Sequence, residues 1–132
     1  MSQENVEIVR LAYEHLNRGD IEGLIELCDD DFVMDMSERV FNPDTYEGDD
    51  GIRRFYDGVT EAWDSYRWNV EETRVSGDSV VALLHCQAQS HRGGPEVDWR
   101  VAWLWSFRGG KPASARFHRD QEEALEAAGL SE

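Results

Sequence analysis

The second half of the chain, from Arg67 onward, reads as a run of long strands separated by short turns. Three turn signals divide it: Ser76-Gly77-Asp78, Arg92-Gly93-Gly94-Pro95 and Arg108-Gly109-Gly110. The segments between them predict four antiparallel strands over about residues 67–75, 79–91, 96–108 and 111–119. A meander of this length has to bury one of its faces, so the fold depends on what the first half supplies.

The first half predicts three helices. Apolar residues at helical spacing predict a helix over about residues 3–17, which Gly19 is placed to end. Asp20 is expected to cap a short second helix. A third helix begins at residues 48–51. Its apolar stripe comprises Ile52, Phe55, Tyr56, Val59, Trp63 and Tyr66.

Two further segments complete the prediction. Residues 38–47, which contain Pro43, are expected to form a loop. A capping box at residues 120–123 predicts a last helix that ends at Gly129. The whole pattern predicts an α+β fold: a cone-shaped, strongly curved antiparallel sheet wrapped around three N-terminal helices, with a short C-terminal helix and an enclosed pocket. With 132 residues and 40% hydrophobic content the chain can build one core and hardly two, so residues 1–132 are expected to form a single domain.

Alternation along the strands assigns their side chains to two faces of the sheet. The inner face is expected to carry Val80, Ala82, Leu84, Cys86, Ala88, Val97, Trp99, Val101, Trp103, Trp105, Ala115 and Phe117. The outer face is mixed, with Val81, Leu83, Ala102 and Leu104 among polar residues. Because scattered apolar residues on a long open face favour self-association, we expect a homodimer through the convex face.

Composition excludes several classes of partner. The net charge is −15, from 28 acidic and 13 basic residues, so nucleic acid and anionic membranes are not expected to bind. The chain has no apolar stretch of membrane-spanning length and no secretory signal pattern, and we expect a cytoplasmic protein. Cys28 and Cys86 stand apart in the sequence and are interpreted as small core residues.

The histidines do not predict a metal site. His85, His91 and His118 could in principle gather on one face, but His85 and His91 lie six residues apart, about 20 Å along a strand, too far to share an ion. The chain also has no Gly-x-Ser-x-Gly elbow and no phosphate-binding glycine loop. We therefore expect no metal and no cofactor.

One carboxylate, Asp35, stands in an otherwise apolar strand, between Met34 and Met36. An ionised carboxylate is costly in a buried strand, so Asp35 is expected to be neutral, paired or used in chemistry. If Met34, Trp103 and Phe117 shield it, its pKa should rise. The alternative is that Asp35 lies at the mouth of the sheet, in water or hydrogen-bonded to a turn.

Several motifs along almost the whole chain resemble those of one superfamily. They are Glu4-Asn5-Val6 with Ala12-Tyr13, residues 17–20, residues 46–48 with 52–56, residues 103–111 and the ending from Asp120 to Leu130. On these residues the chain is similar to the nuclear transport factor 2-like superfamily, and more narrowly to its SnoaL-like and ketosteroid-isomerase-like members. The resemblance implies the cone-shaped fold. It does not specify a reaction, because this scaffold carries many activities.

The resemblance to ketosteroid isomerases implies roles for a few residues. Asp35 falls at the position of the general base, and Tyr56 falls on the supporting tyrosine. The oxyanion-stabilising pair is missing: Ala12 stands at the donor tyrosine, with Tyr13 one residue away, and Trp103 replaces the protonated aspartic acid. Steroid isomerase activity is therefore not expected.

Two other members of the superfamily were compared in the same way. For limonene-type epoxide hydrolases, Met34, Met36 and Phe117 stand where the water-activating groups should be, which excludes that reaction. For polyketide cyclases of the SnoaL type, Asp120 lies near the position of the acid/base residue, although helix capping also accounts for it.

These observations leave two predictions for function. The first is a SnoaL-like domain protein whose apolar, aromatic-lined pocket binds a small hydrophobic molecule, or is filled by its own tryptophans. The alternative is a cofactor-independent isomerase or polyketide-cyclase-like enzyme acting on a carbonyl substrate, with Asp35 as general base and Tyr13 or Tyr56 as hydrogen-bond donor. The residues expected to contact the ligand are Phe55, Val59, Trp63, Trp99, Val101, Trp103 and Phe117.

Overall fold

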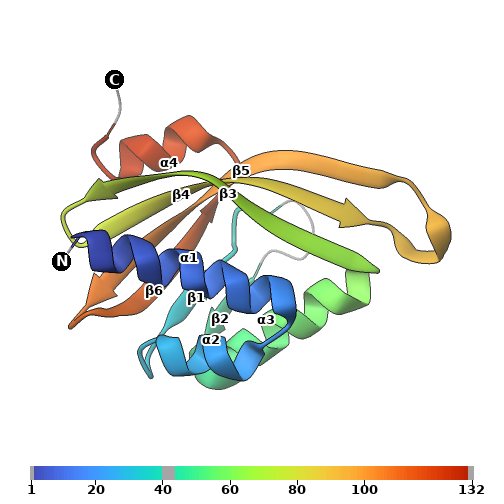
Figure 1. Cartoon of the computed structure of the whole chain (residues 1–132), viewed down its shortest axis with the longest axis horizontal. Coiled ribbons are helices and arrows are strands. Elements are labelled where there is room, and N and C mark those ends of the chain that lie inside the picture. Colours follow the sequence, from blue (N-terminus) through green and yellow to red (C-terminus); the bar gives the residue numbers. More distant parts are fainter. Residues whose placement is uncertain (1, 40–43, 131–132) are drawn as a thin grey trace.

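The computed structural model describes residues 2–39 and 44–130 (Figure 1). The helices are α1 (Ser2–Arg18), α2 (Ile21–Leu27), α3 (Gly48–Ala62) and α4 (Gln121–Ala127). The strands are β1 (Val33–Asp35), β2 (Thr45–Glu47), β3 (Ser65–Ser76), β4 (Ser79–Gln89), β5 (Glu96–Arg108) and β6 (Lys111–His118), and a 3₁₀ turn, η1 (His91–Gly93), joins β4 to β5. Among the described helices, none is long and apolar enough to cross a membrane.

The strands form one sheet in the order β2-β1-β6-β5-β4-β3. The four long strands make the predicted antiparallel meander. β1 runs parallel to β6, with Met34 opposite Ala115, so the sheet is mixed. The sequence had predicted a purely antiparallel sheet. β2, which pairs with β1, occupies the end of the segment predicted as a loop. The three residues of β2 are too few for their sequence pattern to reveal a strand, whereas the apolar residues around Asp35 had predicted β1.

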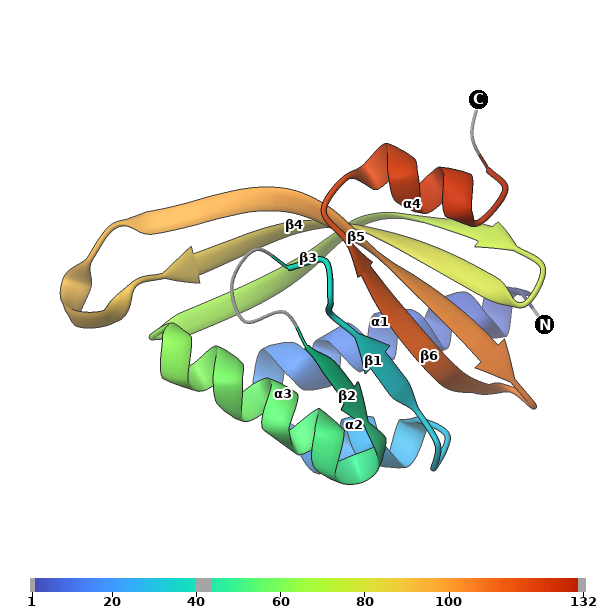
Figure 2. The ribbon, with the colours of Figure 1, turned by 180° about the vertical axis from the view of Figure 1, so that it is seen from behind.

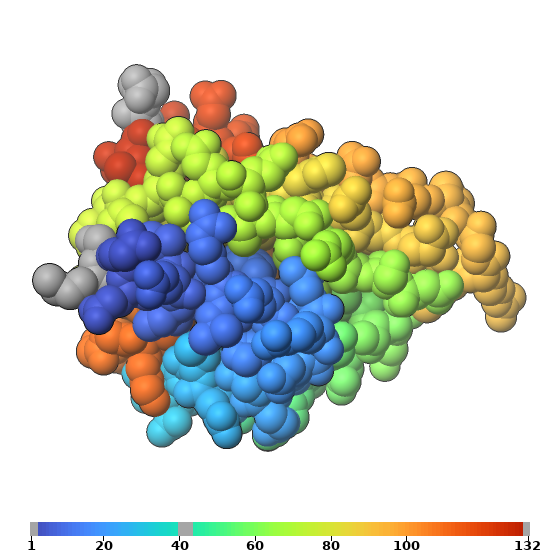
Figure 3. All heavy atoms as spheres, viewed as in Figure 1, coloured from blue at the N-terminus to red at the C-terminus, as the bar shows by residue number. Residues whose placement is uncertain are grey.

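Helices cover both faces of this curved sheet. The first three helices, α1, α2 and α3, lie on its inner face, and α4 lies on its outer face (Figures 1 and 2). The strand register shifts at two places. One lies between Val70 and Glu72 in β3, and the other lies between Ser106 and Phe107 where β5 pairs with β6. Both shifts add local twist to the sheet. The hairpin of β4 and β5 extends beyond the rest of the molecule (Figure 3). The α+β fold predicted from the sequence is thus confirmed.

The main core lies between the inner face of the sheet and the helices. It contains Val80, Ala82, Leu84, Cys86, Val101, Trp103, Trp105, Ala115 and Phe117, all assigned to this face by alternation. Asp20 caps α2, because its side chain accepts a hydrogen bond from the Gly23 N–H at 3.0 Å. The third helix is shorter than its predicted stripe: Trp63 already has an extended backbone, and Tyr66 belongs to β3.

The outer face carries a second, smaller core under α4. Val81, Leu83 and Ala102 are buried there against Ala124 of the helix. Asp120 begins this helix by accepting a hydrogen bond from the Glu122 N–H at 2.8 Å. The apolar residues that suggested a dimer through this face are therefore covered, in part, by the chain's own last helix.

Candidate functional site

A cavity of about 1090 Å³ opens between α3 and the inner face of the sheet. Its wall is formed by Met36, Arg39, Tyr46, Phe55, Gly58, Val59, Glu61, Ala62, Trp63, Tyr66, Trp68, Val97, Trp99, Arg100, Val101, Trp103, Phe117 and Arg119. Amphipathic α3 supplies one side of the cavity, and alternating residues of β3 and β5 supply the other. The site is thus built from regular elements, which hold it in shape.

All seven residues predicted to contact a ligand lie in this wall. Their role in ligand binding stays a prediction. The cavity corrects one version of the sequence hypothesis, in which tryptophans would close the cone. Trp105 packs deeper in the core against Tyr13 and Phe32.

The aromatic rings of the wall support one another. The centroids of Trp63 and Trp99 are 5.7 Å apart, and those of Phe55 and Trp103 are 5.8 Å apart in an edge-to-face arrangement. Tyr66 packs on Trp68 with a centroid distance of 4.4 Å. Aromatic pairs in such geometries add stability beyond simple burial, so the wall is largely formed before any ligand arrives.

Arg39 places a positive charge in this aromatic wall. Its guanidinium carbon lies 5.6 Å from the centroid of the Phe55 ring and 5.8 Å from that of the Tyr46 ring. Its Nη2 donates a hydrogen bond to the Tyr46 hydroxyl at 3.0 Å. Sequence reasoning missed both residues because they lie in the segment predicted as a loop, where no periodicity indicates which side chains face the core.

Tyr66 is a second polar group that the sequence prediction misplaced. Burial, the main cause, raises the pKa of its hydroxyl, with a further contribution from the neighbouring Cys86. Tyr66 is therefore held in its neutral form, and its side chain lines the cavity. Its alternation with Trp68 along β3 is a signal that could have placed both residues on the inner face.

Asp35 does not belong to this wall. Met34 and Met36 on either side of it are buried in the core, so alternation directs Asp35 to the opposite face of the sheet. There it accepts hydrogen bonds from the Ser37 hydroxyl at 2.6 Å and the Ser37 N–H at 3.0 Å. These bonds, with Arg116 3.9 Å away, lower the pKa of Asp35. The expected shielding and raised pKa are wrong, and the alternative of a carboxylate bonded to a turn is confirmed.

The two candidate donor tyrosines also lie elsewhere. The Tyr13 hydroxyl accepts a hydrogen bond from Trp105 Nε1 at 3.0 Å in the core, and burial raises its pKa well above the ordinary value. Tyr56 lines a separate hollow of about 60 Å³ beside the main cavity. The structure therefore does not bring Asp35, Tyr13 and Tyr56 together around one substrate position.

The family assignment agrees with this architecture. A model of the SnoaL-like domain matches residues 9–115 of the chain. The chain belongs to the SnoaL-like domain family. No protein of curated function matched it.

Solved structures similar to this SnoaL-like domain have the same fold. A nuclear transport factor 2-like protein of unknown function from Burkholderia pseudomallei is 23% identical, with a TM-score of 0.78 over 96% of this chain and 97% of that one. TerC co-crystallised with polyporic acid is 22% identical, with a TM-score of 0.78 over 96% and 98%. RV0760c from Mycobacterium tuberculosis in complex with estradiol-17beta-hemisuccinate is 21% identical, with a TM-score of 0.74 over 89% and 94%.

Proposed function

We propose that this SnoaL-like domain binds a small hydrophobic molecule with a ring skeleton and an acidic group. The ring skeleton packs against Trp63, Trp99 and Trp103, and the acidic group points to Arg39. The observation that carries this proposal is a cavity of about 1090 Å³ whose wall combines aromatic rings with a guanidinium group.

The size and lining of the cavity fit such a ligand. Small-molecule sites typically measure about 300–1,000 Å³ and combine an apolar wall with a few polar groups that orient the ligand. This cavity is slightly larger than that range, which leaves room for several fused rings. Flat rings gain most from a wall of this kind, because they can stack on or meet the edges of its aromatic side chains.

Arg39 is the reason to propose an acidic group on the ligand. The chain has a net charge of −15, so a cation in the wall of an apolar cavity stands out from the surrounding charge. A guanidinium carries five N–H donors in a planar fork and can serve several acceptors at once, and carboxylates match its geometry. Arg100 and Arg119, also in the wall, add two more positive charges, while Glu61 adds a negative one.

Two proteins of the same fold support the proposal by analogy. RV0760c was solved with estradiol-17beta-hemisuccinate and TerC with polyporic acid. At 21% and 22% identity these structures share only the fold with the present chain. Their ligands are the reason to begin a binding test with a hemisuccinate.

The enzyme hypothesis receives less support from the site. An isomerase or cyclase needs a base within hydrogen-bond reach of the substrate. Asp35, the proposed base, lies on the other face of the sheet with a lowered pKa. The binding function is therefore the one that the geometry favours.

Three broader predictions remain proposals. We retain a homodimer, for which the part of the outer face beyond α4 is available, with His85, Gln87, Asp98 and Arg100 paired across β4 and β5. We also retain a cytoplasmic location and residues 1–132 as a single domain.

Isothermal titration calorimetry with estradiol-17β-hemisuccinate and estradiol tests the binding proposal, because the two ligands share one ring skeleton. We expect the hemisuccinate to bind more tightly. In Arg39→Met we expect its affinity to fall about 10-fold, the loss of one charge-assisted hydrogen bond, with estradiol binding unchanged. Arg54→Met is the matched control, since Arg54 lies over the ring of Tyr46 but outside the cavity wall. Binding of neither ligand, or an equal loss of both in Arg39→Met, would contradict the proposal.

A further inference from the structure

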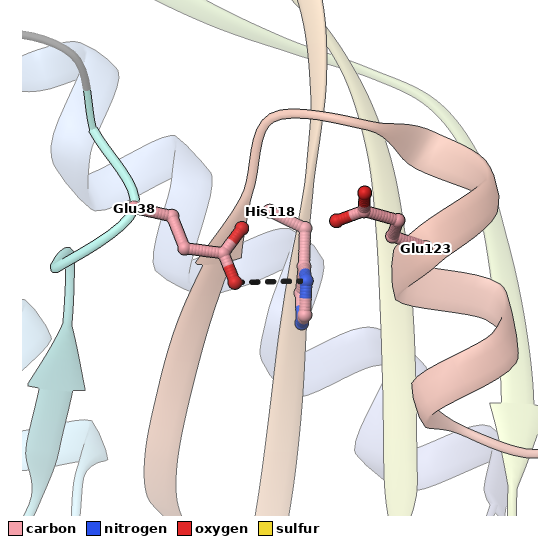
Figure 4. A group of neighbouring side chains, drawn as sticks. All are labelled: Glu38, His118 and Glu123. Carbon is pink, nitrogen blue, oxygen red and sulfur yellow. Dashed lines mark ion pairs between the residues drawn. The ribbon is translucent and has the colours of Figure 1, made fainter.

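Three side chains from different parts of the chain meet on the outer face of the sheet (Figure 4). Glu38 follows β1, His118 ends β6, and Glu123 lies in the first turn of α4. The imidazole of His118 stands between the two carboxylates. Because Phe117 lines the cavity and successive side chains alternate along a strand, His118 faces away from the ligand site.

His118 is unusual among the described residues because it is buried without hydrogen bonds. Its side chain is 5% exposed, and neither Nδ1 nor Nε2 has a hydrogen-bond partner within the described part of the chain. Buried polar atoms in native proteins are nearly always paired, since leaving one unpaired costs the desolvation of that group. A ligand bound to the imidazole would satisfy a nitrogen atom that no side chain hydrogen-bonds.

The geometry of the cluster suits a small cation. One ligand atom from each of the three residues lies within 4.8 Å of the other two. Glu38 Oε2 is 3.8 Å from His118 Nδ1, too long for a hydrogen bond. Ligand atoms about 2.1 Å from a tetrahedral Zn²⁺ are roughly 3.4 Å apart, so a small inward rotation of the two glutamates would close the site. Glu123 is exposed and Glu38 is partly exposed, so neither carboxylate is enclosed by the core.

The local charge also favours a cation. Asp35, Glu38 and Glu123 bring three negative charges to this face, and Arg116, which lies beside Asp35 and Glu38, brings one positive charge, so these four side chains have a formal balance of −2. Arg116 Nη2 lies 3.3 Å from Glu38 Oε2, and its Nε lies 3.9 Å from Asp35. Since Glu38 has a second carboxylate oxygen, it can retain its ion pair with Arg116 and still bind the metal ion.

We propose that Glu38, His118 and Glu123 bind a divalent transition-metal ion of the Zn²⁺ type, with water completing its coordination. One imidazole nitrogen and two carboxylate oxygens form a ligand set that Zn²⁺ accepts, whereas Mg²⁺ prefers oxygen ligands only. The ion joins the segment after β1, the end of β6 and α4, and so holds the last helix on the sheet. The sequence prediction of no metal considered only groups of histidines, and this site pairs one histidine with two glutamates.

Calorimetry with ZnCl₂ on the metal-free protein tests this proposal. We expect one saturable site per chain, and a melting temperature raised by more than about 5 °C at saturation. Glu38→Gln, His118→Asn and Glu123→Gln should each weaken Zn²⁺ binding at least about 10-fold. Glu123→Gln changes an exposed residue, so its folding is not in question. His91→Gln is the matched control, because His91 is an exposed histidine paired with Asp64.

Cobalt(II) gives a direct spectroscopic check. We expect visible absorption bands of protein-bound Co²⁺ that disappear on addition of Zn²⁺ and in His118→Asn but persist in His91→Gln. Any of three results would overturn the proposal: no saturable Zn²⁺ binding, equal affinity in the three site variants and the wild type, or Mg²⁺ binding as tight as Zn²⁺. A cluster that is only an ion pair between His118 and Glu38 would give the first of these results.

Discussion

The side chain of Asn17 and the backbone of Trp68 are joined by two hydrogen bonds. Asn17 Nδ2 donates to the Trp68 carbonyl and Asn17 Oδ1 accepts from the Trp68 N–H, both at 2.8 Å. Asn17 is in the last turn of α1, and Trp68 lies in β3 with its ring in the cavity wall. The amide therefore fixes the first helix to the strand that forms one side of the cavity.

Asn17→Ala should destabilise the protein by about 2–4 kcal/mol, because two partly buried backbone groups of Trp68 lose their partner. The free energy of unfolding from urea denaturation measures this effect. Glu14→Ala, at an exposed site one turn earlier on α1, should change stability by less than about 0.5 kcal/mol. Equal stability of the Asn17 variant and the wild type would show that the two bonds do not hold the helix.

Asp35 should titrate below its ordinary pKa in the folded protein. Its hydrogen bonds from Ser37 favour the ionised form. A depressed pKa means that this carboxylate stabilises the fold above the unfolded-state value of 3.8, and that the contribution is lost as the pH falls through the folded-state pKa. NMR titration of the Asp35 carboxyl carbon measures the value, and Ser37→Ala should raise it. A pKa above the ordinary value would instead support the sequence hypothesis of a shielded base.

Both cysteines should react slowly with thiol reagents in the folded protein. Burial raises the pKa of Cys86 to about 11 and that of Cys28 to about 12. Since the thiolate is the reactive form, we expect Ellman's reagent at pH 8 to modify the native protein at least about 100-fold more slowly than the protein in guanidinium chloride. Rapid modification of one thiol in the native state would mean that its surroundings open readily.

Local sequence patterns were sufficient for most of the fold. Alternation placed Val80, Ala82, Leu84 and Cys86 on the inner face because a strand repeats every two residues whatever surrounds it. The cap at Asp20 was predictable for a similar reason, since it depends on residues within one helical turn. Alternation also predicted Trp99, Trp103 and Phe117 of the cavity wall, and helical periodicity predicted Phe55 and Trp63.

The misplaced site residues depend on contacts between distant segments. Arg39 lies in the cavity wall because β1 and β2 join the edge of the sheet, and the three residues of β2 leave no periodic signal. In the proposed metal site, Glu38 is far from His118 and Glu123 in the sequence, and the parallel pairing of β1 with β6 brings it to His118. Asp35 differs: the flanking Met34 and Met36 already indicated its face, but the family resemblance favoured another reading.

The central claim, that the cavity is a ligand site, is tested most directly at Gly58. This glycine lies within α3 and in the cavity wall, and a Cβ built on it meets no atom within 4 Å. Gly58→Ala should stabilise the helix by about 0.5–1 kcal/mol and leave room in the cavity, which makes it the matched control for the larger Gly58→Phe.

The deciding measurement is the dissociation constant of estradiol-17β-hemisuccinate for the wild type, Gly58→Ala and Gly58→Phe, each shown to be folded by circular dichroism. We predict binding to the first two and a loss of at least about 10-fold in Gly58→Phe, whose ring occupies the cavity. Equal affinity for all three proteins would contradict the account, because the ligand would then bind elsewhere.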